Sequence, residues 1–239
     1  MAGRTPRAAG LEPGPAVPAQ VSYALVSRAA QAQALDILGG FHPETDEKQL
    51  EGFGTVLLLG PREPGFWGSF TQSREYRDGT PNPMDRWSAR VLTGLAVAFN
   101  AQPFFPFGGP PYRPFYQWAL RTGRCHPSPI SLLVHDNAGL FVSFRGALAL
   151  QQRLDLPPAP PNPCSACTRK PCQSACPVSA FENGTYAVNK CQAYLAQPQG
   201  AACMSQGCAA RRACPVSATY GRVAAQSALH MQAFLTNGA

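Results

Sequence analysis

The sequence predicts an α/β (α+β) protein built in two parts. Short apolar runs of strand length alternate with helical patterns in the first part, a proline-rich joint follows, and eight cysteines then fall between Cys164 and Cys214. We therefore expect four segments along the chain, which are a disordered tail over 1–20, an α/β domain over 21–155, a cysteine-rich domain over 156–221 and a C-terminal helix over 222–239.

The elements of the α/β domain follow from local patterns. Apolar spacing predicts a helix within 21–40 that ends at Gly39–Gly40, and Asp85 can cap a second helix that continues to Phe99. Residues 101–118 combine five prolines with seven aromatic side chains, which predicts an ordered loop with aromatic packing. Apolar runs predict three strands, the last two joined by a hairpin turn over 136–139: Thr55–Leu59, Ile130–His135 and Leu140–Phe144.

Prolines mark the joint between the two parts. Five of them fall between Pro157 and Pro163, and this stretch is the clearest domain boundary in the sequence. The chain ends in an amphipathic segment, Arg222 to Leu235, which predicts a helix that packs back on the first domain.

The composition argues against several protein classes. No apolar run reaches the roughly 18–20 residues that a membrane span requires. Residues 1–20 lack the apolar centre of a secretory signal, so we expect a cytoplasmic protein, with an organelle transit peptide as the weaker alternative. Because the cytosol keeps thiols reduced, nine cysteines in such a chain favour metal binding over a disulfide framework.

Eight of the cysteines form two groups with iron–sulfur spacing. The first is Cys164-x2-Cys167-x4-Cys172-x3-Cys176-Pro, and the second is Cys191-x11-Cys203-x4-Cys208-x5-Cys214-Pro. In bacterial two-cluster ferredoxins, closely spaced cysteines hold one [4Fe–4S] cluster and the cysteine before proline serves the other. This rule predicts cluster I on Cys164, Cys167, Cys172 and Cys214, and cluster II on Cys191, Cys203, Cys208 and Cys176.

An internal repeat supports this crossed arrangement. The pentapeptide Cys-Pro-Val-Ser-Ala begins at Cys176 and recurs unchanged at Cys214. The alternative is a pair of structural zinc sites, which also take sets of four cysteines, but zinc sites favour paired C-x2-C knuckles and only one C-x2-C is present. The x4 gap after Cys167 departs from the usual x2 of the ferredoxin run, so the ligand set is better specified than its division between clusters.

The charge of the cysteine-rich part suits anionic cofactors. The whole chain carries a formal net charge of +7, and residues 160–239 contain six Lys or Arg and only one acid, Glu182. A cubane held by four thiolates carries about −2, and a site's own ion belongs in its charge balance. The basic residues, including Arg211 and Arg212, then compensate the clusters, and nucleic acid is not the expected partner.

The motifs around the cysteines resemble a known family. Cys164 to Cys214, with the segment Cys191-Gln-Ala-Tyr194-Leu195, is similar to the ferredoxin module of epoxyqueuosine reductase, the iron–sulfur and cobalamin enzyme of tRNA queuosine synthesis. Ser128 to His135 and the segment FVSFRGAL from Phe141 look like the strand pair that precedes that module. Short bacterial ferredoxin-like proteins with PFGGPP and RGAL segments are more similar still.

The resemblance covers about half of the chain, roughly residues 118–218. It implies that residues 21–155 form a small α/β domain of the flavin- and cobalamin-binding type. The family's N-terminal catalytic segment and its downstream helical repeats have no match here, so the resemblance implies the fold more strongly than the reaction.

The remaining candidate residues have structural explanations. Cys125 is expected to be a packed thiol. The histidines are scattered along the chain and are expected to be packing or capping residues: His42, His126, His135 and His230. Asp85 and Asp136 fit a helix start and a turn, and Gly108–Pro111 fits a rigid turn better than a cofactor contact.

Three functions then stay open. The first is electron transfer to a redox partner protein of unknown identity. The second is a cluster-dependent oxidoreductase whose N-terminal domain holds a corrinoid or flavin in an apolar pocket framed by the predicted strands and the 101–118 loop. The third is a structural or regulatory cluster protein without turnover.

Overall fold

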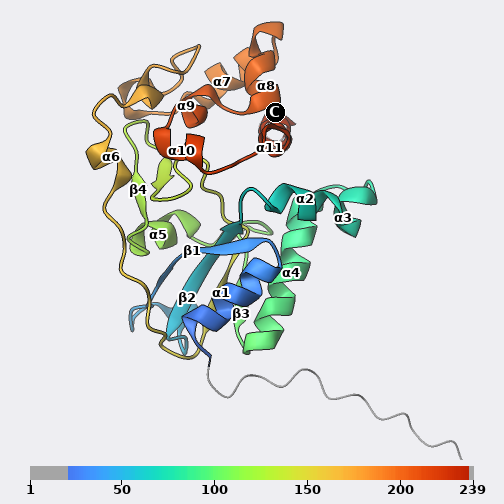
Figure 1. Cartoon of the computed structure of the whole chain (residues 1–239), viewed down its shortest axis with the longest axis vertical. Coiled ribbons are helices and arrows are strands. Elements are labelled where there is room, and N and C mark those ends of the chain that lie inside the picture. The colour runs from blue at the N-terminus through green and yellow to red at the C-terminus, as the bar shows by residue number, and fades with distance from the viewer. Residues whose placement is uncertain (1–20, 237–239) are drawn as a thin grey trace, which may run out of the picture.

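The fold, taken from a computed structural model that describes residues 21–236, is a mixture of helices and small antiparallel sheets (Figure 1). Its centre is a four-stranded sheet in the order β1-β2-β6-β3, in which all neighbours are antiparallel. The strands are β1 (Leu35–Phe41), β2 (Thr55–Pro61), β3 (Gln102–Phe104) and β6 (Gly146–Leu150).

The two faces of the sheet pack against different layers. Successive side chains of a strand point to opposite faces, and β2 is buried on both. Leu57 and Leu59 pack into one core with three helices, whereas Val56 and Leu58 pack into a second core with α5. The helices of the first core are α1 (Tyr23–Ala32), α2 (Phe66–Thr71) and α4 (Pro83–Phe99), and α5 spans Phe115–Arg121.

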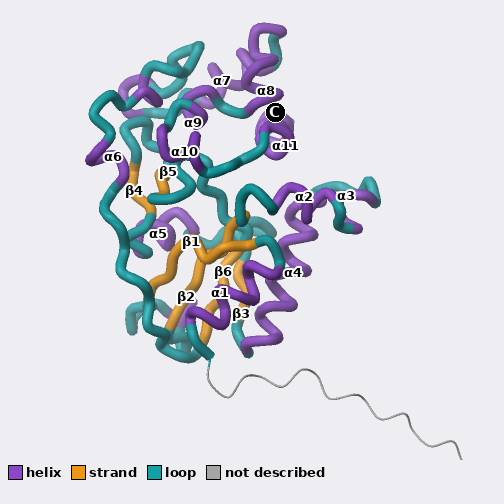
Figure 2. Tube along the Cα trace, viewed as in Figure 1, coloured by secondary structure: helices purple, strands orange, loops and turns teal. Residues whose placement is uncertain are grey.

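A two-stranded ribbon connects the sheet to the cysteine-rich part. It consists of β4 (Cys125–Pro127) and β5 (Leu133–His135), which pair antiparallel. Beyond an extended stretch over 151–162, the chain forms only short helices, with much loop between them (Figure 2). These are α6 (Pro163–Ala166), α7 (Val188–Leu195), α8 (Ala201–Gln206), α9 (Ala209–Arg212), α10 (Pro215–Thr219), and the 3₁₀ turns η2 (Pro171–Gln173), η3 (Glu182–Gly184) and η4 (Pro198–Gly200).

The last helix, α11 (Ala224–Thr236), lies between the two parts. It packs chiefly against α8, and its Leu229 reaches the core beneath α1 and α4. The expected C-terminal helix is therefore present, and residues 237–239 of that prediction lie outside the described residues, as does the predicted tail over 1–20. Two minor elements complete the first part, η1 (Lys48–Leu50) and α3 (Arg74–Arg77).

Several element predictions are correct. The predicted strand Thr55–Leu59 lies within β2, and the helix predicted from Asp85 to Phe99 is α4. That helix begins slightly earlier than predicted, with Asn82 at its N-cap and Pro83 at its first position, where a missing N–H costs nothing. Asp85 lies in its first turn and forms an ion pair with Arg145 at 3.4 Å.

The helix predicted over 21–40 is only half correct. It stops at Ala32, and Ala34 then takes a left-handed conformation (φ +56°) that turns the chain into β1. Pairing with β2 decides the conformation of residues 35–41, because long-range strand pairing overrides local preference. Local preference does not predict strand β6, Gly-Ala-Leu-Ala-Leu, since alanine and leucine favour helices in isolation, and only the FVSFRGAL segment of the resemblance overlaps its first three residues.

The strand predicted over Leu140–Phe144 is wrong, and the strand predicted over Ile130–His135 is reduced to β5. The backbone of residues 140–141 is hydrogen-bonded to side chains of the cysteine-rich part instead of to a neighbouring strand. Leu140 N–H donates to Ser217 Oγ at 2.8 Å, and the carbonyls of Leu140 and Phe141 accept from Arg211 and Arg222. With its backbone groups satisfied in this way, the segment needs no sheet partner.

Candidate metal centres

Four of the predicted ligands line one cavity, here called site I, of about 270 Å³. They come from three places in the chain, since α6 supplies two of them near its ends, η2 supplies the third and the residue before α10 supplies the fourth. These residues are Cys164, Cys167, Cys172 and Cys214. The rest of the wall is mainly apolar, with Val134 and Leu140 from the β5 region and prolines from the cysteine-rich part.

Local geometry holds the cysteines of site I in place. Asn162 caps α6, and its Oδ1 accepts a hydrogen bond from Cys164 N–H at 2.9 Å. Pro215 occupies the first position of α10, so Cys214 stands at the N-cap with an extended backbone. Burial, together with the neighbouring thiols of Cys172 and Cys214, raises the pKa of the Cys164 thiol.

The other four predicted ligands line a second cavity, here called site II, of only about 20 Å³. One lies in the middle of α7, one in α8, one at the N-cap of α9 and one in the loop after η2: Cys191, Cys203, Cys208 and Cys176. The backbone N–H of Ala180 donates to Cys176 Sγ at 3.3 Å. Burial raises the pKa of the Cys191 thiol, while a hydrogen bond from Tyr186 opposes that rise.

The two cavities divide the eight cysteines in the same way as the crossed pattern of the sequence does. Cys176 belongs to the first group in the sequence and lines the cavity of the second, and Cys214 does the reverse. Within residues 21–236, no three His, Cys, Asp or Glu side chains form a group that could hold a single metal ion. The thiols of each set surround a cavity without closing on one point.

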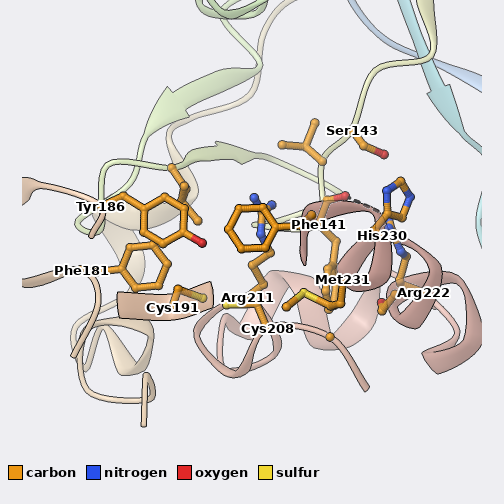
Figure 3. A pocket seen from close by; sticks show the side chains of 15 residues that line it. Phe141, Ser143, Phe181, Tyr186, Cys191, Cys208, Arg211, Arg222, His230 and Met231 are labelled. Carbon is orange, nitrogen blue, oxygen red and sulfur yellow. Dashed lines mark hydrogen bonds between the residues drawn. The ribbon is translucent and has the colours of Figure 1, made fainter. Parts of the chain in front are cut away.

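A third cavity, of about 220 Å³, adjoins site II and is here called the junction cavity (Figure 3). Cys191 and Cys208 line both cavities. The remaining wall combines the connector Phe141–Ser143 with side chains of the cysteine-rich part and of α11. The sequence predicts an apolar pocket framed by three strands and the 101–118 loop. Of these segments, Ile130–His135 and Leu140–Phe144 contribute residues to this cavity, whereas the 101–118 loop and β2 contribute none.

Cys125 lies away from both sites. It sits in β4 within the core around α5 and is 1% exposed. Burial raises the pKa of its thiol to about 12, so the side chain stays protonated and inert at neutral pH.

His135 has a structural role in the turn that precedes the connector. Its Nδ1 accepts hydrogen bonds from the backbone N–H groups of Asn137 and Ala138 at 3.1 Å, which leaves Nε2 to donate to the carbonyl of Leu38 at 2.8 Å. Burial lowers the pKa of His135 to about 4, so the ring is neutral. His42 also bonds a carbonyl, that of Leu154.

The turn itself contacts helix α10, which follows the site I ligand Cys214. Gly139 has a φ of +56°, and an added Cβ there would stand 2.4 Å from the backbone nitrogen of Ser217 on α10. The neighbouring Asp136 forms a two-pronged ion pair with Arg124, at 2.9 and 2.8 Å. The sequence predicts a hairpin turn here but gives no sign of the contact with α10, which the serine of the repeated pentapeptide makes.

Comparisons of the chain with family models, with curated proteins and with solved structures give no match. Within the described residues, no helix combines the length and the apolar character needed to cross a membrane.

Proposed function

We propose that this protein carries two [4Fe–4S] clusters, at site I and site II, and transfers electrons to a partner protein. One observation carries the proposal. Eight cysteines from two sequence groups surround two separate cavities in sets of four, with the cysteine before each proline exchanged between the sets. This exchange is the ligand pattern of two-cluster ferredoxins. The similarity to the ferredoxin module of epoxyqueuosine reductase supports the same proposal.

The donor chemistry of both sites fits the cofactor. Thiolates are the ligands of iron–sulfur clusters, and each site offers four. Site I, at about 270 Å³, has room for a group of several atoms, whereas site II, at about 20 Å³, has room for about one water molecule. Site II therefore fits by its ligands, and its walls have to widen to admit a cluster.

The surrounding residues tune the sites in two ways. Apolar walls, such as Val134 and Leu140 at site I, limit the access of water. Basic side chains lie near both sites, with Lys170 at site I and Arg211 beside the Cys208 thiol at site II. A bound [4Fe–4S] cluster takes up and releases one electron, at a potential that its surroundings set.

Two alternatives have less support. A zinc ion lies about 2.3 Å from each of four sulfurs, and the 270 Å³ of site I exceeds what one ion fills. An oxidoreductase with a corrinoid or flavin, in a domain of the flavin- and cobalamin-binding type, needs a cofactor pocket. The junction cavity, at about 220 Å³, is below the roughly 300–1,000 Å³ of sites for drug-sized ligands.

Metal analysis and voltammetry of protein purified without oxygen test the proposal. We expect about eight irons and eight acid-labile sulfides per chain, a brown colour, and a reversible one-electron couple. Zinc in place of iron would overturn the cluster assignment. Iron without a reversible couple would overturn electron transfer and leave a structural or regulatory role.

The ninth cysteine provides a matched control. Because Cys125 is buried away from both sites, Cys125→Ser should keep the full iron content. A loss of about half of the iron in this variant would contradict the ligand set.

A further inference from the structure

Buried positive charge lies along the junction cavity, with Arg211 beside Cys208 and Arg222 at the end away from site II. Figure 3 shows Tyr186 and Cys191 at one end of the cavity and Arg222 and His230 at the other. The electrostatic field of three arginines, Arg145, Arg211 and Arg222, acts on His230 and adds to burial in lowering its pKa. This end of the cavity is therefore a buried site of positive potential.

The arginines are only partly compensated by protein groups. Arg145 forms an ion pair with Asp85 at 3.4 Å. Among the described residues, Arg211 and Arg222 have no carboxylate within 4.0 Å, and the hydrogen bonds that they donate go to the carbonyls of Leu140 and Phe141. Guanidinium groups offer five N–H donors each, so these hydrogen bonds use only one donor of each arginine.

One carboxyl compensates Arg222 in part. The charge of Glu63 acts on Arg222, and burial raises the pKa of Glu63. Two acids, Asp85 and Glu63, then face the three arginines. Neither of its carboxyl oxygens has a hydrogen-bond partner within 3.5 Å, although Gln226 lies close to it. Burial lowers the pKa of Arg222 to about 10, which still leaves it charged at neutral pH.

Other polar atoms at this end also lack partners. Ser143 Oγ, Arg222 Nε and His230 Nε2 are sealed from solvent and form no hydrogen bond within the described protein. Buried polar groups in folded proteins are generally hydrogen-bonded, and an unpaired set calls for an explanation such as a missing ligand. The guanidinium Nε of Arg222 can only donate, and a hydroxyl and a neutral imidazole can donate as well, so a single acceptor would suit all three.

The rest of the cavity is aromatic. The Arg222 guanidinium lies 5.5 Å from the centre of the Phe141 ring. Phe181, Tyr186 and Phe234 form a parallel stack, with ring centres 4.7 and 6.2 Å apart. Such walls favour a flat apolar body, because aromatic surfaces stack well on one another.

We propose that the junction cavity binds a small planar organic anion, an aromatic ring that bears a carboxylate, with the carboxylate at Arg222 and the ring against Phe141. Arginine suits this role because its planar fork matches the two oxygens of a carboxylate. The volume of about 220 Å³ limits the ligand to about one ring with small substituents. The site does not require iron, although Cys191 places a bound ligand beside site II.

Calorimetric titration of the full chain, purified without oxygen, tests this proposal with two probes of equal shape. Benzoate carries the charge and benzamide does not. We expect benzoate to bind at least about tenfold more tightly than benzamide, because only the anion compensates the arginines. Equal affinities, or no binding of benzoate at 10 mM of probe, would overturn the proposal.

A pair of variants locates the site. Arg222→Gln should weaken benzoate binding at least about tenfold and leave benzamide unchanged. Arg28→Gln removes the same charge from an exposed position of α1 and should leave both affinities unchanged. Should Arg222→Gln not fold, as judged by circular dichroism, Arg222→Lys keeps the charge without the fork and should weaken benzoate by a smaller factor. Equal losses in the Arg222 and Arg28 variants would overturn the assignment.

The same titration separates this proposal from the proposed function. If the protein contains no iron, benzoate should still bind, and the anion site stands without the clusters. A crystal structure in which cluster atoms fill the junction cavity would overturn the anion site and leave the electron-transfer proposal intact.

Discussion

The pentapeptide Cys-Pro-Val-Ser-Ala occurs twice, and its two copies have different conformations. At Cys214 it begins helix α10, and Ala218 N–H closes a helical bond to the Cys214 carbonyl. At Cys176 it forms a turn that ends at Ser179, whose φ of +50° is left-handed, and Ala180 N–H donates to the Cys176 sulfur instead. The sequence is the same, so the surroundings decide.

The difference arises at the serine. Ser217 is 2% exposed and accepts the Leu140 N–H, while Gly139 packs against its backbone. Ser179 is exposed, and no described residue hydrogen-bonds to its side chain. The first part of the protein therefore holds the serine of the copy at site I, and it makes no such bond to the serine of the copy at site II.

Among the tests of this comparison, replacing either repeat cysteine by alanine should have the largest effect. Cys214→Ala removes a ligand from site I, and Cys176→Ala removes one from site II, so each should cost about half of the iron. Site II has to widen before it can hold a cluster, whereas site I does not. We therefore expect Cys176→Ala, which keeps site I intact, to retain its iron longer than Cys214→Ala during incubation with a chelator. Iron content and electron paramagnetic resonance distinguish the two sites. Loss of the same cluster in both variants would contradict the crossed assignment.

Gly139→Ala tests the contact that fixes α10. The new Cβ would stand 2.4 Å from Ser217 N and would occupy a left-handed position, so we expect a loss of about 2–5 kcal/mol in the free energy of unfolding. Gly79→Ala is a matched control, since Gly79 has a φ of +70° with nothing within 4 Å, and it should cost about 1–2 kcal/mol. Urea denaturation measures both. Equal costs would show that the contact with α10 is unimportant.

His135 makes the same turn sensitive to acid. Its pKa is about 4 in the folded protein and 6.5 in the reference state, so the unfolded chain takes up a proton first as the pH falls. Stability from this group is complete above pH 6.5 and declines as the pH falls from 6.5 to about 4, by up to about 3 kcal/mol. Urea unfolding at several pH values measures the slope. His135→Gln should flatten the slope over this range, and an unchanged slope would assign the acid sensitivity to other groups.

Ser217→Ala should have the smallest effect of the four changes. It leaves the buried Leu140 N–H without an acceptor, which costs about 1–3 kcal/mol. Ser179→Ala changes the same position of the other repeat copy and should stay within about 0.5 kcal/mol, because that side chain is exposed. Thermal unfolding of the two variants gives the comparison directly. A larger cost at Ser179 would reverse our account of the repeat.

The grouping of the cysteines into two sets can be predicted without a structure. Most ligands of a cluster lie close together in the sequence, and the remaining ligand comes from a second group of cysteines. The spacing of the cysteines and the repeat of Cys-Pro show both groups. Helix α4 and strand β2 can also be predicted from the sequence, because their apolar patterns are long or dense enough to specify the secondary structure locally.

The contacts that join the two parts, by contrast, depend on residues that are far apart in the sequence. Strand β6 and the path of residues 140–145 depend on partners far away in the sequence, such as β2 for the strand and Ser217 for Leu140. Residues of the connector after β5 and of helix α11 line the junction cavity together with Arg222, and no local sequence pattern predicts that these segments lie close together. Local spacing encodes which residues can share a ligand, whereas long-range hydrogen bonds and burial decide where the chain satisfies its remaining polar groups.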